Sequence, residues 1–209
     1  MPFKKLAVTA AVLLLCVAAE RTAYHFYGPR GELTRPKTDT SRSKGKIDAP
    51  LWITEYMDYQ CQTCALAYPL LESYLKDHPG RIYLQVKSYP VVGHQHGEIA
   101  AVYAECAARQ RAFWPYHETV LMRQSEWVSA DDPTPLFRQY ANEAAMDLAE
   151  LDRCASDPST LSAVRTEAAA ARALGVRGTP SFFIDGKLVV GEIEFKKTMR
   201  SYLEKKDPQ

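Results

Sequence analysis

The sequence predicts an α/β fold in which a βαβ unit and a ββα unit are separated by an all-helical insertion. Two apolar-rich runs, 51–57 and 81–89, flank a segment with helical periodicity, and parallel strands need such a crossover. From 98 to 174 nearly every segment has helical periodicity. The chain then returns to two short strands and a final helix, so the predicted order is βαβ, helical block, ββα.

The first strand is expected at 51–57, where Pro50 leads into a run typical of a buried strand. The helix after it ends near Pro79 and Gly80, because both residues interrupt helices. Its apolar residues are Cys64, Leu66, Leu70, Leu71 and Leu75. The run 81–89 is rich in β-branched and aromatic residues, which predicts the second strand.

The helical block contains apolar residues spaced for buried helix faces. Its last helix is expected over 161–174, with Ser159 or Thr160 as the N-cap and Gly175 after its end. We find no internal repeat in this block. These residues therefore predict separate packed helices.

The C-terminal part of the chain has a strong hairpin signal. Asp185-Gly186 lies between the apolar runs 181–184 and 188–190, and Asp-Gly favours a tight turn between strands. A helix over 192–203 is expected to complete the fold.

The N-terminus has the pattern of a targeting segment. Lys4 and Lys5 precede the apolar run 6–19, which is shorter than the about 20 residues of a membrane span. We expect 1–23 to be a signal peptide or N-terminal membrane anchor, and the polar stretch 24–48 to be a flexible linker. The bulk of the chain is then periplasmic or otherwise extracytoplasmic, soluble after cleavage or anchored, and structural disulfides can persist there.

Composition excludes one class of partner. The chain has 26 basic and 25 acidic residues and a net charge of +1. It shows no basic stripe with interleaved aromatic residues, so we expect no nucleic-acid partner.

The most informative motif is Cys61-Gln62-Thr63-Cys64, which follows the first strand and opens a helix. Two thiols one helical turn apart can exchange between dithiol and disulfide, and a helix N-terminus stabilises the first as a thiolate. Spacing alone is weak, because five cysteines give such a pair by chance roughly one time in ten. A zinc site needs two more ligands, and neither a second CxxC nor a His-x₃₋₅-His motif is present, so no metal is expected.

Four features place this motif in a wider pattern. Asp58-Tyr59-Gln60 precedes the cysteines, Pro69 lies in the following helix, 113–117 is an aromatic-histidine segment, and 175–186 contains Gly-Thr-Pro before the hairpin. From 48 to about 203 the chain resembles the DsbA-like branch of thiol–disulfide oxidoreductases. The resemblance implies a thioredoxin fold interrupted by a helical insertion.

On this basis we expect the thioredoxin-like domain to comprise 49–92 and 176–205, with the helical insertion over 93–175. The resemblance further implies that the protein acts on cysteine-containing exported proteins. It also implies a membrane redox partner that regenerates the cysteine pair, and no cofactor beyond that pair.

Cys61 is expected to be the nucleophile, because it occupies the exposed helix end, and Cys64 the resolving thiol. The resemblance implies a cis bond between Thr179 and Pro180, with Thr179 pairing to an extended substrate; a trans proline at a strand start is the alternative. Glu55 matches the buried proton acceptor of such folds, although it could instead face outward.

Two further cysteines, Cys106 and Cys154, lie on apolar faces of the helical block. In an exported protein we expect a structural disulfide between them, worth up to about 4 kcal/mol in the chain-entropy model. The alternative is two free buried cysteines that behave as small apolar residues.

The histidines are weaker candidates. His94 and His96 are two positions apart and do not share a helix face, which favours loop or cap positions over metal binding. His117 lies among aromatic residues and is expected to be a core or groove histidine, not a catalyst.

We expect an exported enzyme that forms disulfides in protein substrates. Gln62 and Thr63 replace the proline and histidine common in the family, and threonine supplies a hydrogen bond but no imidazolium charge. A weaker oxidant than the strongest members is therefore expected, and a Cys61 pKa below about 4 would contradict this. Alternatives are a disulfide reductase or isomerase, a redox-silent binding module or chaperone, and, more remotely, metal delivery.

Overall fold

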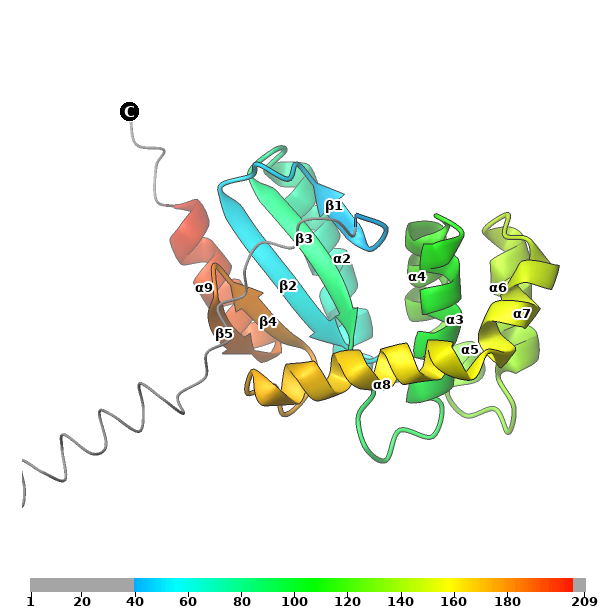
Figure 1. The fold of residues 1–209 in the computed structure, drawn as a ribbon. Coiled ribbons are helices and arrows are strands. Elements are labelled where there is room, and N and C mark those ends of the chain that lie inside the picture. The colour runs from blue at the N-terminus through cyan, green and yellow to red at the C-terminus, as the bar shows by residue number, and fades with distance from the viewer. Residues whose placement is uncertain (1–39, 205–209) are drawn as a thin grey trace, which may run out of the picture. The chain divides into compact units, whose positions relative to one another are not determined.

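The computed structural model describes residues 40–204 and contains a five-stranded mixed sheet with the order β1-β3-β2-β4-β5 (Figure 1). Its strands are β1 (Ser43–Gly45), β2 (Leu51–Met57), β3 (Ile82–Ser88), β4 (Ser181–Ile184) and β5 (Lys187–Val190). β2 and β3 are parallel, and the other neighbouring pairs are antiparallel. The predicted α/β fold class is confirmed.

The helices follow the predicted arrangement. They are α2 (Gln62–Asp77), α3 (Gly97–Arg109), α4 (Phe113–Met122), α5 (Gln124–Trp127), α6 (Thr134–Glu143), α7 (Leu148–Ser156), α8 (Pro158–Ala173) and α9 (Gly191–Leu203). In Figure 1, α3 to α7 form a separate block beside the sheet, and the long α8 runs back from this block toward β4. The helical insertion therefore lies between β3 and β4 in the sequence.

Alternation along β2 divides its side chains between two packed layers. Ile53 and Met57 belong to the main core with residues of α2 and α9, whereas Tyr56 packs with residues of α8. Glu55 has the same parity as Ile53 and Met57, so it points to the α2 side of the sheet. This register directs one carboxyl group toward the start of α2.

The core of the helical block is largely aromatic. The Trp127 and Phe137 rings meet edge to face with centroids 5.1 Å apart, and Trp127 Nε1 donates to the Val120 carbonyl at 2.9 Å. Both rings are fully buried, so the insertion has its own packed interior.

The expected disulfide of this block is present between Cys106 in α3 and Cys154 in α7. Its S–S distance is 2.02 Å and its Cα–Cα distance is 5.8 Å. Both cysteines are buried. The bond joins two helices whose sequence separation is 48.

The predicted start of the last inserted helix was wrong. α8 begins at Pro158, and its N-cap is Asp157, whose carboxylate accepts from the Ser159 N–H at 2.8 Å. Aspartate is a strong N-cap and proline suits the first helical position, so this pair outcompetes the hydroxyl residues that follow. The Thr160 hydroxyl instead donates to the buried Cys154 carbonyl at 2.8 Å.

The linker prediction for 24–48 was also wrong over its C-terminal part. Ser43–Gly45 form a strand on the edge of β3, and Arg42 makes two hydrogen bonds to Glu167 in α8, at 2.9 and 3.0 Å. Trp114 Nε1 donates to the Ser43 carbonyl at 3.1 Å. These distant partners stabilise a segment whose polar composition resembles a linker; the targeting segment and the rest of the linker lie outside the described residues.

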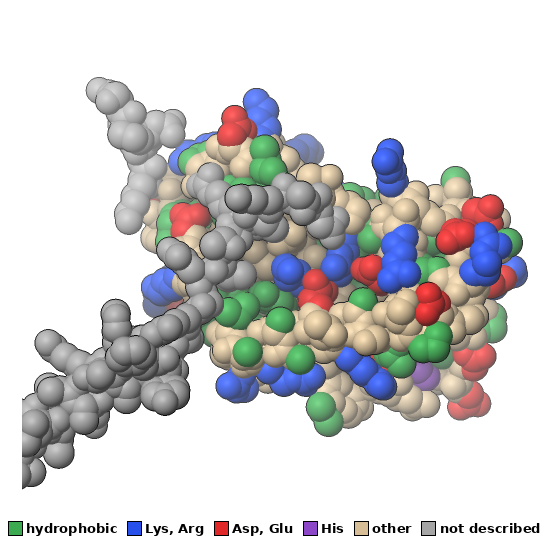
Figure 2. All heavy atoms as spheres, in the orientation of Figure 1, with side chains coloured by type: hydrophobic (Ala, Val, Ile, Leu, Met, Phe, Trp, Pro, Cys, Tyr) green, Lys and Arg blue, Asp and Glu red, His purple; other side chains and the backbone are tan. Residues whose placement is uncertain are grey.

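The surface carries mixed charge. Figure 2 shows Asp and Glu side chains beside Lys and Arg side chains over the face that it displays. Within 40–204, no helix combines the length and the apolar character that a membrane crossing requires.

Candidate active site

Cys61 and Cys64 lie where β2 leads into α2. After β2 ends, the chain turns, and the Cys61 N–H donates to the Asp58 carbonyl at 3.1 Å. Cys61 is the N-cap residue of α2 and is partly exposed, whereas Cys64 is 1% exposed. A substrate can therefore reach Cys61 and not Cys64.

Hydrogen bonds favour the thiolate of Cys61. They come first from the Cys64 thiol and then from Thr179, Thr63 and the Cys64 backbone, and against the opposing effect of burial they lower the pKa of Cys61 to about 4. Thr63 Oγ1 lies 3.0 Å from Cys61 Sγ, where its hydroxyl can donate. The first turn of α2 contains no acidic residue that would oppose a negative charge there.

Cys64 has the opposite character. Burial, its hydrogen bond with Cys61, and the charges of Cys61 and Glu55 hold the pKa of Cys64 well above its usual range. At neutral pH the reduced pair therefore holds one thiolate, at the exposed position, and one thiol, at the buried position.

Glu55 lies on β2 and is 3% exposed. Burial, followed by the negative charge of Cys61, raises the pKa of Glu55 to about 8. The carboxyl therefore faces inward, and at neutral pH most of it carries a proton.

The loop before β4 lies beside the cysteine pair. The Thr179–Pro180 peptide bond is cis, and the Thr179 carbonyl oxygen lies 3.5 Å from both Cys61 Sγ and Thr63 Oγ1. The Pro180 carbonyl accepts from the Gly191 N–H at 2.9 Å, and the Ser181 hydroxyl donates to the Gly178 carbonyl at 2.7 Å. These bonds hold the loop against the sheet. The structure therefore brings Thr179, which is distant in sequence, beside Cys61 and Thr63 as predicted.

The dipeptide between the cysteines is exposed, and its two members differ. Thr63 contacts Cys61 as described above, and Gln62 begins α2. Pro69 lies within α2 and is exposed. The hydroxyl of Thr63 thus supplies part of the stabilisation that a histidine would supply by charge in the family pattern.

Sequence reasoning missed the structural role of Asp58, which it treated only as part of the lead-in. The Asp58 side chain is fully buried, and its carboxylate accepts from the Gln60 N–H at 2.8 Å and the Val91 N–H at 2.7 Å. His94 Nδ1 lies 2.8 Å from the same carboxylate. An acidic residue directly after a buried strand was the available signal, but its partners lie far along the chain.

His96 and His117, the other two histidines considered from the sequence, are both buried. His96 is the N-cap residue of α3, and its Nε2 lies 2.8 Å from the Ala130 carbonyl oxygen. His117 Nδ1 lies 2.9 Å from the Tyr59 hydroxyl, and burial, followed by the charge of Lys44, lowers the pKa of His117 to about 3. His117 is therefore a neutral core residue, in line with its expected position among aromatic rings.

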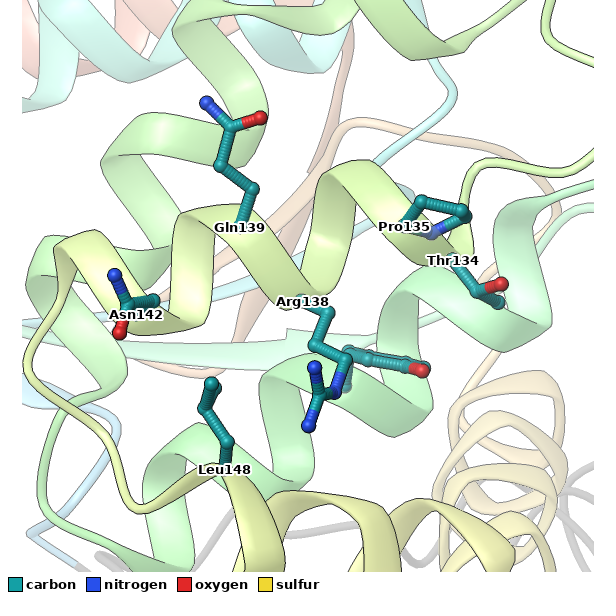
Figure 3. A pocket seen from close by; sticks show the side chains of 7 residues that line it. Thr134, Pro135, Arg138, Gln139, Asn142 and Leu148 are labelled. Atoms are coloured by element: carbon teal, nitrogen blue, oxygen red, sulfur yellow. The ribbon is translucent and has the colours of Figure 1, made fainter.

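A separate hollow of about 470 Å³ lies in the helical block (Figure 3). Figure 3 shows Arg138 on the helix that also carries Gln139 and Asn142, above Leu148. Arg138 forms an ion pair with Asp152 at 3.0 Å, so its charge is already compensated. This hollow contains none of the predicted redox residues, and no group of three or more possible metal-ligating residues occurs within 40–204.

Comparison with known proteins supports the reading of this geometry. A family model described as Thioredoxin matches residues 37–205. The chain belongs to the thioredoxin family. The match includes the cysteine pair, the helical block and the Thr179–Pro180 loop, so it spans both parts of the predicted domain.

Curated relatives fall into two groups. The chain is 31% identical over 150 residues to Na(+)/H(+) antiporter NhaA 3 of Salinispora tropica, which covers 71% of this chain and 22% of the antiporter. It thus spans about a quarter or less of the first relatives that it matches. It is 24% identical over 177 residues to a protein of Bacillus cereus named probable disulfide bond formation protein D, covering 79% of this chain and 80% of that protein.

Solved structures share the fold. BdbD from Bacillus subtilis, in its oxidised form, has a TM-score of 0.68 and 20% identity, covering 81% of this chain and 96% of BdbD. A thioredoxin-like oxidoreductase from Silicibacter pomeroyi has a TM-score of 0.66 and 21% identity, covering 83% of this chain and all of that one. The predicted resemblance in fold is confirmed.

Proposed function

We propose that this protein is an exported thiol–disulfide oxidoreductase that forms disulfides in cysteine-containing exported proteins. The observation that carries the proposal is the asymmetry of the pair: a Cys61 pKa of about 4 beside a buried Cys64 whose pKa is far above its usual range. The name of the Bacillus cereus relative agrees with this chemistry.

Oxidation of a substrate proceeds through a mixed disulfide. A substrate thiolate attacks Sγ of Cys61 in the oxidised protein, breaks the Cys61–Cys64 bond and displaces Cys64, which takes up a proton. A second substrate thiolate attacks the substrate sulfur of the mixed disulfide, forms the substrate disulfide and releases Cys61 as a thiolate. Two electrons pass to the pair; one proton ends on Cys64 and the other enters solvent.

Glu55 is the proposed proton donor and acceptor for Cys64. Its carboxyl interacts electrostatically with both cysteines and, with a pKa of about 8, carries a proton at neutral pH. In substrate oxidation it can supply the proton that Cys64 needs when it leaves. In regeneration it can take that proton back, because each step reverses the other.

The direction follows from which state is stabilised. A low Cys61 pKa stabilises the reduced pair and makes its disulfide a better oxidant. Gln62 and Thr63 predict a weaker oxidant than the strongest family members, and a Cys61 pKa of about 4, with hydrogen bonds from Cys64, Thr179 and Thr63, does not fall below the limit of about 4 that would contradict this. This supports disulfide formation over reduction or isomerisation.

The partners follow from the electron balance. The reduced pair must pass two electrons to an oxidant before the next cycle, and we propose a membrane redox partner for that step. The cysteine pair is the proposed redox group, with no added cofactor. An extracytoplasmic location, with the N-terminal segment as signal or anchor, would give access to both partners.

The reduction potential of the Cys61–Cys64 couple tests the proposal. Equilibration with glutathione buffers should give a value closer to about −120 mV, which indicates an oxidase, than to about −270 mV, which would indicate a reductase. Cys61→Ser should abolish oxidation of a reduced, unfolded substrate. Cys64→Ser, mixed with a disulfide-containing protein, should attack that disulfide through Cys61, release one substrate thiolate, and accumulate a mixed disulfide that gel electrophoresis resolves without reductant. If the wild type and Cys61→Ser bound the substrate equally and neither oxidised it, the protein would be a binding module whose cysteines are structural.

A further inference from the structure

A buried carboxylate, Asp58, joins the active-site turn to the loop that precedes α3. Its oxygens accept from the Gln60 N–H at 2.8 Å and the Val91 N–H at 2.7 Å, and His94 Nδ1 donates to it at 2.8 Å. One partner is in the turn and two are in the loop. The side chain itself is fully buried, so water cannot readily replace these donors, and loss of a donor would leave a buried carboxylate oxygen without a hydrogen bond.

The backbone of Asp58 faces both cysteines. Its carbonyl accepts from the Cys61 N–H at 3.1 Å, and its backbone hydrogen bond with Cys64 favours the charged form of that thiol. A displacement of Asp58 therefore changes the surroundings of both sulfur atoms at once.

The loop and the turn meet at further points. Gln60 Oε1 accepts from the His96 N–H at 2.7 Å. Gly97 lies so close that a Cβ there would be 2.9 and 3.0 Å from the two oxygens of the Asp58 carboxylate. The turn, the loop and the start of α3 thus form one closely fitted unit.

We propose that Asp58 is a positioning residue of the redox site, which fixes the Cys61 and Cys64 sulfur atoms through its hold on the loop that contains Val91 and His94. This inference rests on the proposed redox function. Asp58 acts through the backbone and contacts no substrate atom.

A carboxylate suits this position because three donors point at it. Asparagine has nearly the same shape, but its amide nitrogen would face N–H groups and it carries no charge. Two effects of Asp58→Asn on Cys61 then have opposite signs. Loss of a nearby negative charge would lower the pKa of Cys61, whereas loosening of the turn would raise it, because the hydrogen bonds to the thiolate lengthen.

The test is a titration of the reduced protein, in which the ultraviolet absorbance of the Cys61 thiolate is followed against pH. We expect Asp58→Asn to raise the Cys61 pKa by about one unit, a tenfold change in its ionisation constant. The matched control is Asp152→Asn, which removes an exposed carboxylate of the helical block and should leave this pKa unchanged. An unchanged or lowered pKa in Asp58→Asn would overturn the proposal.

His94 provides a second, milder perturbation in case Asp58→Asn does not fold. His94→Ala removes one donor and should raise the Cys61 pKa in the same direction by less. His94→Asn places an amide N–H where Nδ1 was and should restore the wild-type value. Equal values for the wild type and both variants would overturn the proposal.

The titration needs no substrate, so it separates this inference from the proposed function. A wild-type protein that oxidises no substrate would refute the function. In that event the Asp58 and His94 variants would still show whether the contacts of Asp58 with the loop affect the Cys61 pKa.

Discussion

Replacement of Glu55 by glutamine should stabilise the protein in a manner that depends on pH. Glu55 is 3% exposed, and its pKa is raised from 4.5 to about 8 in the folded state. Glutamine has almost the same shape and does not ionise. Above pH 4.5 the wild type therefore loses free energy of unfolding through Glu55, whereas Glu55→Gln does not.

The sign and size of the penalty follow from proton linkage. Below pH 4.5 both states carry the Glu55 proton, and ionisation has no effect on stability. Between 4.5 and about 8 the unfolded state loses the proton while the folded state keeps it, so the free energy of unfolding falls by about 1.4 kcal/mol per pH unit. At pH 7 the accumulated loss reaches up to about 3 kcal/mol.

The assay is urea unfolding of the wild type and Glu55→Gln at several pH values from 4.5 to 8. The oxidised protein is used, because Cys61 and Cys64 then do not titrate and burial alone acts on Glu55. The advantage of Glu55→Gln should be smallest at the acid end and grow steadily toward pH 7. Glu98→Gln, at an exposed ion pair with Arg165, is the control and should show no such growth.

Parallel stability curves for the wild type and Glu55→Gln would refute the reasoning. They would mean that Glu55 ionises alike in the folded and unfolded states, and hence that the carboxyl is solvated. Glu55 could then not hold the proton that Cys64 exchanges at neutral pH.

Three further changes test other parts of the structure. Thr63→Val removes the hydroxyl 3.0 Å from Cys61 Sγ and should raise the Cys61 pKa by roughly half a unit to one unit, measured by thiolate absorbance; an unchanged value would assign the low pKa to the other donors. Replacement of both Cys106 and Cys154 by alanine should lower the free energy of unfolding by about 4 kcal/mol in the chain-entropy model while leaving the Cys61 pKa unchanged, and a shifted pKa would contradict a purely structural bond. Arg42→Gln leaves a half-buried carboxylate on α8 without its guanidinium and should cost about 1–3 kcal/mol in urea unfolding; a loss below a few tenths would show that the β1 segment contributes little.

Local sequence patterns predicted the two central strands and the C-terminal hairpin. Apolar runs placed β2 and β3 to within a residue, and Asp185-Gly186 placed the hairpin, because each signal is contained in a few neighbouring residues. The predicted N-cap of α8, Ser159 or Thr160, was wrong by two or three residues, because several adjacent residues can cap a helix. Asp157 with Pro158 is a stronger start than the hydroxyl residues after it.

Features that depend on distant partners were not visible in the sequence. The Arg42–Glu167 contact joins residues separated by 125 positions, and the Asp58–His94 contact joins residues separated by 36. No composition rule shows that a polar segment will find an acid on α8, or that an aspartate will be buried under a loop. The cysteine pair was recognisable because its chemistry is contained within four residues.

Burial disfavours the anionic forms of both Cys64 and Glu55. Both groups face the apolar interior behind α2, and burial raises the pKa of each. The site therefore tolerates one negative charge, and the hydrogen bonds place it on Cys61, the sulfur that solvent can reach. When a substrate thiolate takes over the bond to Cys61, the charge must move inward to Cys64, where it is disfavoured unless a proton arrives. In the proposed mechanism, a protonated Glu55 supplies that proton from within the same buried region, which links the burial of the acid to the burial of the resolving thiol.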